Sequence, residues 1–166
     1  MDLQLLNTLP MDQANHLFMQ CCTSERWIEE MVANRPFVDS NNLRETADHI
    51  WNHLTEKDYL QAFEGHPKIG DVDSLKAKYA NTKELASDEQ SGANCATDEI
   101  IAELADSNSA YEEKYGFIFI VCATGKSAKE MLALLQDRLK NDRQKELEIA
   151  NEEQRKIFHL RLEKLL

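Results

Sequence analysis

The most unusual stretch of the sequence is GHPKIGD, at residues 65–71. His66 is predicted to follow a helix that ends at Gly65, where the partial negative charge of the exposed carbonyl groups favours the protonated imidazolium. Pro67 fixes the next backbone angle and has no N–H group to donate. The stretch predicts a rigidly held, readily protonated histidine, although its spacing alone favours a loop histidine that satisfies a turn.

A second candidate site is SDEQ, at residues 87–90, where a helix is predicted to begin. The positive end of that helix keeps Glu89 ionised, so its oxygens only accept hydrogen bonds, while the Gln90 amide offers two donors and one acceptor. Taken alone, these residues favour simple capping, with Ser87 and Gln90 satisfying the first turn and Glu89 in solvent.

A third feature is the apolar run FIFIVCA at residues 117–123, between Gly116 and Gly125. Its composition is typical of a strand, but no second strand is predicted to pair with it. Buried backbone N–H and C=O groups are almost always hydrogen-bonded. The backbone of this segment must therefore be satisfied by side chains and water or by a polar ligand, and the sequence leaves both possibilities open.

Other patterns are weaker. His49 and His53 lie four residues apart on one helix face, as two metal ligands would, but no third ligand is evident and we predict no metal site. TGKS at residues 124–127 resembles the end of a phosphate-binding loop, but Ile120 stands where the first glycine is required. We therefore interpret Ser127 as a helix cap.

The elements that must position these residues are helices, because apolar residues recur at three- and four-residue spacing and only five glycines and three prolines interrupt them. Caps are expected at Ser40, at the Thr55–Asp58 and Ser127–Glu130 boxes, and at Asn141, with Gly65 as a left-handed C-cap. The expected helices cover approximately residues 11–21, 24–35, 40–53, 55–65, 74–80, 87–115, 127–140 and 141–166. Thr97 is expected to be a cap or a kink within the helix at 87–115.

Length and charge narrow the class of protein. A chain of 166 residues fits one domain, and 30 acidic against 19 basic residues give a net charge of −11, which disfavours nucleic acid and anionic membranes as partners. No export signal or membrane span is evident, and four cysteines without a Cys-x-x-Cys pair are typical of reduced thiols. We therefore expect a cytoplasmic protein.

Three ordered motifs resemble one known family. FEGHPKIG at residues 63–70, SDEQSGA at residues 87–93 and YGFIFIVCA at residues 115–123 are similar to motifs of the 2-oxo-4-hydroxy-4-carboxy-5-ureidoimidazoline (OHCU) decarboxylases. The resemblance covers nearly the whole chain. It implies an all-α, single-domain multi-helix bundle over residues 1–166, with one extended apolar segment near residues 117–123, and a homodimer.

The resemblance also implies the roles of individual residues. His66 and Glu89 would be catalytic, and the substrate-binding residues would be Pro67, Ala86, Ser87, Gln90, Phe119, Ile120, Val121, Cys122 and Ala123. The family has serine where Ala86 stands here, and Ser87 follows it, so the resemblance implies either position 86 or position 87 beside the substrate. Members of the family often have proline where Ile118 stands, so the local backbone is less constrained here.

The implied reaction converts OHCU to (S)-allantoin, the last step from urate to allantoin. The substrate carboxylate lies next to a ring C=N, which can accept the electrons that loss of carbon dioxide releases, so no cofactor is expected. His66 would move the proton while Glu89 and Gln90 hold the substrate nitrogens. Two other classes remain open: a helical module whose apolar run binds a partner protein, and a helical metal-binding protein that uses His49 and His53.

Overall fold

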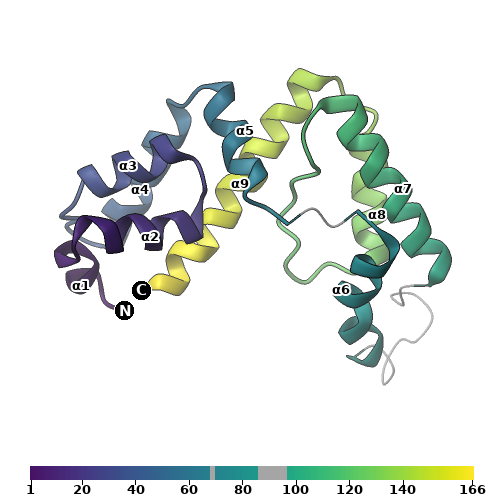
Figure 1. Ribbon diagram of the computed structural model, residues 1–166, viewed down its shortest axis with the longest axis horizontal. Helices are drawn as coiled ribbons and strands as arrows, with labels where there is room; N and C mark the ends of the chain where they lie inside the picture. Colours follow the sequence, from purple (N-terminus) through teal and green to yellow (C-terminus); the bar gives the residue numbers. More distant parts are fainter. Residues whose placement is uncertain (68–69, 86–96) are drawn as a thin grey trace. The chain divides into compact units, whose positions relative to one another are not determined.

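The computed structural model describes residues 1–67, 70–85 and 97–166, and within these ranges the chain forms nine α-helices and no strand (Figure 1). The predicted all-α class is confirmed. The chain divides into two compact units. The first unit comprises Met1–His66 and Asn151–Leu166, and the second comprises Pro67–Ala150.

Aromatic side chains form the centre of the first unit. The Phe158 ring lies 5.1 Å from the Trp27 ring and 5.6 Å from the Trp51 ring, and both Trp27 and Phe158 are fully buried. The last helix, α9, thereby packs against α3 and α4. The helices of this unit are α1 (Leu3–Thr8), α2 (Met11–Cys21), α3 (Glu25–Ala33), α4 (Ser40–Asn52), α5 (Glu56–Glu64) and the C-terminal part of α9 (Arg143–Leu165).

The helices of the first unit largely match the sequence pattern, apart from one additional helix and two helix caps. Helix α1 was not expected, and the Asp2 carboxylate caps it by accepting a hydrogen bond from the Leu5 N–H. The predicted cap at Ser40 is wrong, because Asp39 accepts from the Asn42 N–H at 2.7 Å. Aspartate is as good a cap as serine, and Asp39 has the extended backbone that a cap requires.

Gly65 ends α5 as predicted, but its conformation is right-handed (φ −72°), so the expected left-handed cap is wrong. The reason for glycine here is space. A Cβ atom on Gly65 would lie 2.1 Å from Oγ1 of Thr23, which donates hydrogen bonds to the carbonyl oxygens of Gln61 and Ala62. The Thr23 hydroxyl thus satisfies the exposed end of α5, and only glycine leaves room for it.

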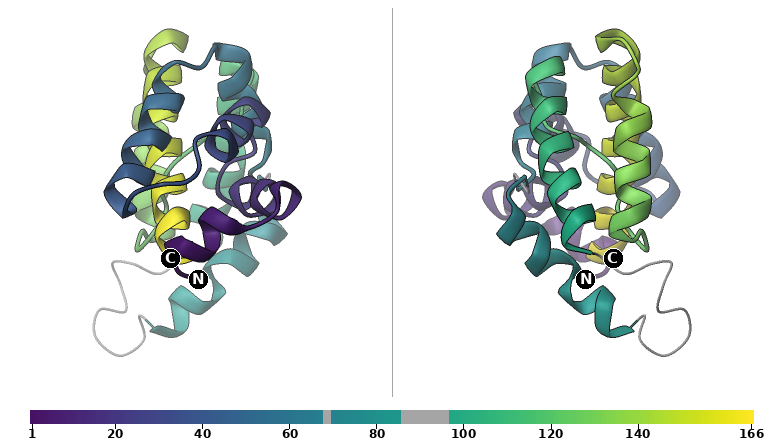
Figure 2. Two further views of the ribbon diagram at one scale, coloured as in Figure 1. Left: turned by 90° about the vertical axis from the view of Figure 1, so that its left-hand side faces the viewer. Right: turned by 90° about the vertical axis from the view of Figure 1, so that its right-hand side faces the viewer.

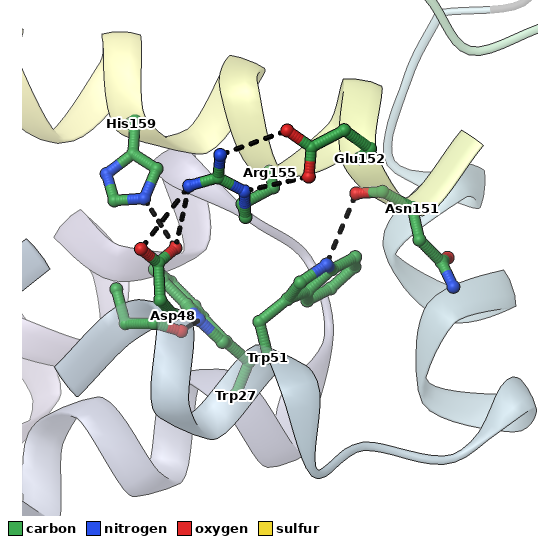
Figure 3. Close-up of polar contacts among 8 residues, drawn as sticks. Trp27, Asp48, Trp51, Asn151, Glu152, Arg155 and His159 are labelled. Carbon is green, nitrogen blue, oxygen red and sulfur yellow. Dashed lines mark hydrogen bonds and ion pairs between the residues drawn. The ribbon is translucent and has the colours of Figure 1, made fainter. Parts of the chain in front are cut away.

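A charged cluster links α4 to α9 near the surface of the first unit (Figure 3). The Asp48 carboxylate accepts from Nε2 of His159 at 2.6 Å and from Nη1 of Arg155 at 3.2 Å, while Arg155 also pairs with Glu152. Beside it, the Trp51 indole N–H donates to the carbonyl oxygen of Asn151. These contacts fix the C-terminal part of α9 to the helix that carries Trp51.

The second unit contains α6 (Val72–Leu85), α7 (Asp98–Tyr115), α8 (Ala128–Arg138) and the first part of α9. Helices α7 and α8 pack side by side (Figure 2). The caps at Thr97 and the Ser127–Glu130 box are confirmed, and Gly116 ends α7 with a left-handed φ of 79°. Residues 117–123 connect α7 to α8 without helix or strand, as predicted.

Two boundaries of the second unit differ from the prediction. Helix α6 is longer at both ends than the predicted 74–80. It begins before Ser74 because the Asp71 carboxylate acts as its cap, accepting from the Ser74 N–H at 2.7 Å. The cap predicted at Asn141 is wrong, since the Asp142 carboxylate accepts from the Lys145 N–H at 2.8 Å. The Asn141 side chain instead donates to the Glu146 carboxylate.

The cysteine side chains agree with the sequence where they are described. Cys21, Cys22 and Cys122 are free thiols, and burial raises the pKa of both Cys21 and Cys22 to about 12. These two thiols stay protonated and unreactive at neutral pH.

Among the described helices, none is long and apolar enough to cross a membrane.

Candidate functional site

His66 is held by both its backbone and its ring. Its N–H donates to the Phe63 carbonyl oxygen at 3.1 Å, in the turn that closes α5. Its Nε2 atom lies 2.5 Å from Oε1 of Gln154, which is fully buried on α9. The half-buried imidazole is therefore rigidly presented, as the sequence predicted.

The expected protonation of His66 is wrong. Burial lowers its pKa below the ordinary value, a shift that the Gln154 hydrogen bond opposes and the positive charge of Arg161 reinforces. The negative end of α5, which the sequence argument invoked, is already satisfied by the Thr23 hydroxyl. A neutral histidine at neutral pH has one nitrogen free to accept a proton, so the group is suited to act first as a base.

Arg161 supplies a positive charge near this histidine from the next turns of α9. Among the described residues, its Nη1 atom makes only long hydrogen bonds, of 3.4 Å to the Cys21 carbonyl oxygen and 3.5 Å to that of Gln20. A guanidinium has five N–H donors, so Arg161 retains the capacity to bind a carboxylate in two-point fashion.

In the second unit, the apolar segment at residues 117–123 has carbonyl groups that are met by side chains. The Ile120 carbonyl oxygen accepts from Nη1 of Arg138 at 2.5 Å, and the Cys122 carbonyl oxygen accepts from Nζ of Lys126 at 2.8 Å. The backbone N–H of Lys126 donates to the carbonyl oxygen of Ala123. Of the two possibilities left open, side chains therefore account for these carbonyl groups.

The backbone N–H groups of residues 119–123, unlike the carbonyl groups of this segment, lack hydrogen-bond partners among the described residues. Phe119, Val121, Cys122 and Ala123 are half-buried and Ile120 is buried. A row of backbone donors set among apolar side chains is typical of a small-molecule site.

A buried ion pair anchors this segment. Arg138 on α8 bonds to the fully buried carboxylate of Glu146 on α9, which also accepts from the Tyr111 hydroxyl and from the Asn141 amide. The Arg138 guanidinium lies over the Phe119 ring, 4.4 Å from its centroid. Because the same guanidinium also bonds to the Ile120 carbonyl oxygen, the pair fixes both the backbone and one ring of the segment.

The predicted site residues thus fall into three groups. His66 and Pro67 follow α5, and residues 119–123 lie between α7 and α8. Ala86, Ser87, Glu89 and Gln90 lie outside the described residues, as does the cap predicted at Ser87. Sequence reasoning missed Gln154, Arg138 and Glu146, all of which are polar residues on otherwise buried helix faces.

His49 and His53 do not form a ready pair of metal ligands. Their ring centroids lie 4.4 Å apart with the ring planes tilted by 43°, and Nδ1 of His53 lies 2.7 Å from the His49 carbonyl oxygen. Across the part of the chain that the structure describes, no three His, Cys, Asp or Glu side chains are grouped to hold a metal ion.

Comparisons with known proteins agree with these features. The model of the OHCU decarboxylase family matches residues 7–163. The uric acid degradation bifunctional protein TTL of Arabidopsis thaliana is 34% identical over 145 residues, which cover 87% of this chain and 45% of that protein. The chain therefore spans less than half the length of this relative.

Two further relatives are closer to this chain in length. The 2-oxo-4-hydroxy-4-carboxy-5-ureidoimidazoline decarboxylase of Amia calva is 28% identical over 134 residues, covering 81% of this chain and 76% of that protein. A crystal structure of an OHCU decarboxylase in the presence of (S)-allantoin has a TM-score of 0.72 and 35% identity, covering 89% of this chain and 95% of its own. With a family model that matches almost from end to end, the chain belongs to the OHCU decarboxylase family.

Proposed function

We propose that this protein decarboxylates OHCU to (S)-allantoin, the last step of urate conversion to allantoin, without a cofactor. The observation that carries the proposal is the family match over residues 7–163, which includes His66 and the segment at residues 119–123. Two relatives carry the names of this pathway, and one solved relative was crystallised with (S)-allantoin.

The proposed chemistry uses a neutral His66. The bond between the ring carbon and the carboxylate breaks, carbon dioxide leaves, and the electron pair moves into the neighbouring ring C=N, whose nitrogen takes up one proton from solvent. His66 takes the proton of the substrate hydroxyl and delivers a proton to the carbon that bears the ureido group. Burial supports this order, because it lowers the pKa of His66 and keeps one ring nitrogen free to accept a proton.

Substrate binding is proposed to use the other residues of the family motifs. The N–H groups of residues 119–123 would donate to the oxygens of the ligand, with Pro67 as part of the pocket wall. Glu89 and Gln90 would hold the ureido and ring nitrogens, and Ala86 or Ser87 would lie beside them. Arg161 would bind the substrate carboxylate, since its own hydrogen bonds are long.

The test generates OHCU enzymatically from urate and follows its decay by circular dichroism, with and without a chelator. We expect faster decay that resists the chelator and gives (S)-allantoin, because one donor would protonate one face. Uncatalysed decay gives a racemate. A binding module would leave the decay rate unchanged, loss of activity in chelator would favour a metal enzyme, and equal enantiomers at an accelerated rate would contradict the proposal.

The role of His66 is tested by substitution. His66→Asn keeps a polar side chain but cannot exchange a proton near neutral pH, so turnover should fall by about 10²- to 10⁴-fold. His53→Asn is the matched control, because it is the same substitution at an exposed histidine. If folded His66→Asn retained more than about half of the turnover, His66 would be a structural residue.

Glu89→Gln tests substrate holding separately from proton transfer. The variant loses the charge that would pair with ligand N–H groups, so weaker binding should accompany a lower rate. Because both groups would act on one bound intermediate, His66→Asn combined with Glu89→Gln should be little worse than His66→Asn alone. Multiplied losses in the double variant would argue against a shared site.

We further propose that residues 1–166 act as one domain, since one family model runs through both compact units. The assembly is proposed to be a homodimer in the cytoplasm. Sedimentation should show a dimer, and a monomer at all protein concentrations would contradict it. Imaging of a tagged protein in its host tests the compartment, and accumulation in an organelle would contradict it.

A further inference from the structure

Gln154 is a fully buried polar side chain that has no part in the proposed binding or proton-transfer steps. Its Oε1 atom lies 2.5 Å from Nε2 of His66. Its own Nε2 atom is buried and has no hydrogen-bond partner among the described residues. A buried donor without a partner is unfavourable, so the favourable contact of this amide is the one that its oxygen makes.

An amide oxygen can only accept a hydrogen bond. The contact with Gln154 therefore requires the hydrogen of a neutral His66 to be on Nε2, which leaves the lone pair on Nδ1. The neutral form is the relevant one, because burial disfavours the charged imidazolium.

The His66 ring has little freedom to flip and so swap the positions of Nδ1 and Nε2. The backbone on its N-terminal side is fixed by the hydrogen bonds of Gly65 and His66 to the last turn of α5. Pro67 restricts the backbone on the other side. With the main chain held at both ends, the Gln154 oxygen determines which face and which nitrogen of the imidazole point away from α9.

We propose that Gln154 is a positioning residue that holds His66 as the Nε2–H tautomer and leaves Nδ1 as the atom that exchanges the proton with the substrate. This inference rests on the proposed function of His66. Gln154 itself touches no reacting atom and acts only through the histidine.

The amide also suits a group that must give its proton back. A carboxylate at this position would stabilise the imidazolium by charge and hold the proton, whereas a neutral oxygen orients the ring without that attraction. Among the described residues, the charged side chain that acts on His66 is Arg161, from the same helix α9, and its positive charge also favours the neutral ring.

The first experiment reads the tautomer directly in the full-length, ¹⁵N-labelled protein without substrate. At a pH above the ordinary histidine pKa of about 6.5, long-range ¹H–¹⁵N spectra should show His66 protonated on Nε2. Gln154→Leu should give a mixture of both tautomers. An Nδ1–H tautomer in the wild type, or an unchanged tautomer in a folded Gln154→Leu variant, would overturn the proposal.

The second experiment uses Gln154→Glu, which keeps the size and an acceptor oxygen but adds charge. An opposite charge at this distance raises a histidine pKa by roughly 1 to 3 units, and the acid limb of the kcat/KM profile should move up by the same amount. NMR titration of His66 follows the same shift without substrate. An unmoved His66 pKa would show that the two side chains are not in contact and would overturn the proposal.

The kinetic readout separates positioning from binding. Gln154→Leu should lower kcat roughly 10- to 100-fold with KM nearly unchanged, as loss of a group that orients a reactive histidine does. Gln144→Leu and Gln144→Glu are matched controls, because Gln144 is an exposed glutamine in the first turn of the same helix. Both controls should leave kcat and the His66 spectra unchanged.

The two proposals fail in different ways. A wild-type protein with Nε2–H His66 that does not accelerate OHCU decay would refute the proposed function and leave the tautomer assignment standing. An active wild-type protein with Nδ1–H His66 would refute only the role of Gln154.

Discussion

Replacing Glu146 by glutamine should destabilise the protein far more than its conservative chemistry suggests. The Glu146 side chain is 0% exposed and that of Arg138 is 8% exposed, so their ion pair is screened from water. Glu146→Gln preserves the size of the side chain but leaves the Arg138 cation buried without a counter-charge. Breaking a buried pair in this way costs about 3–5 kcal/mol in the free energy of unfolding.

Asp48→Asn is the matched control. Asp48 also pairs with an arginine, Arg155, and with His159, but its side chain is 34% exposed. Exposed ion pairs contribute about 0–1 kcal/mol. Asp48→Asn, in the first unit, should therefore lower the free energy of unfolding several times less than Glu146→Gln, in the second unit.

Urea unfolding gives the free energy of unfolding of both variants, and thermal unfolding gives their melting temperatures, each monitored by circular dichroism. At this chain length, about 2–4 °C of melting temperature corresponds to 1 kcal/mol, so Glu146→Gln should lower the melting temperature by roughly 6–20 °C. Removing both charges, as in Glu146→Gln with Arg138→Met, should cost less than the sum of the single changes. If Glu146→Gln cost no more than Asp48→Asn, the pair would not be buried and the reasoning would fail.

Two further predictions concern the end of α5. Gly65→Ala should destabilise the protein by about 1–3 kcal/mol in urea unfolding, because the new Cβ would lie 2.1 Å from Oγ1 of Thr23; an unchanged midpoint would refute the crowding argument. Burial lowers the pKa of His66 in the folded chain, so the unfolded chain binds more protons in acid, and stability should fall as the pH drops below about 6.5 and through the folded pKa. Urea midpoints at a series of pH values should show a shallower fall for His66→Asn, and equal slopes would contradict the shifted pKa.

Most of the helical structure could be predicted, because it depends on local signals. The capping boxes at Thr55 and Ser127 and the helix end at Tyr115, before Gly116, appear in the structure where the sequence predicted them. The caps at Asp39 and Asp142 were missed in favour of neighbouring Ser40 and Asn141. Adjacent residues with similar capping strength differ only in backbone geometry, which the sequence does not specify.

The electrostatic state of His66 could not be predicted, because it depends on residues far away in the sequence. In the local sequence, His66 follows a helix C-terminus, whose partial negative charge would raise its pKa. The structure instead satisfies that terminus with Thr23 and surrounds the ring with Gln154 and Arg161. Burial and a distant positive charge outweigh the helix dipole, which acts only within about one turn.

One long-range signal was nevertheless present in the sequence of α9. Glu146, Ala150, Gln154, Phe158 and Leu162 recur at four-residue spacing, and all five are buried. Three of these residues are ordinary core residues, but a charged and an amide side chain on the same buried stripe require partners. Glu146 pairs with Arg138, and Gln154 hydrogen-bonds to His66, so each polar residue on the stripe stabilises one part of the proposed site. In α9, the polar side chains that interrupt the buried stripe therefore point to the positioning residues, whereas the site motifs point to the groups that those residues hold.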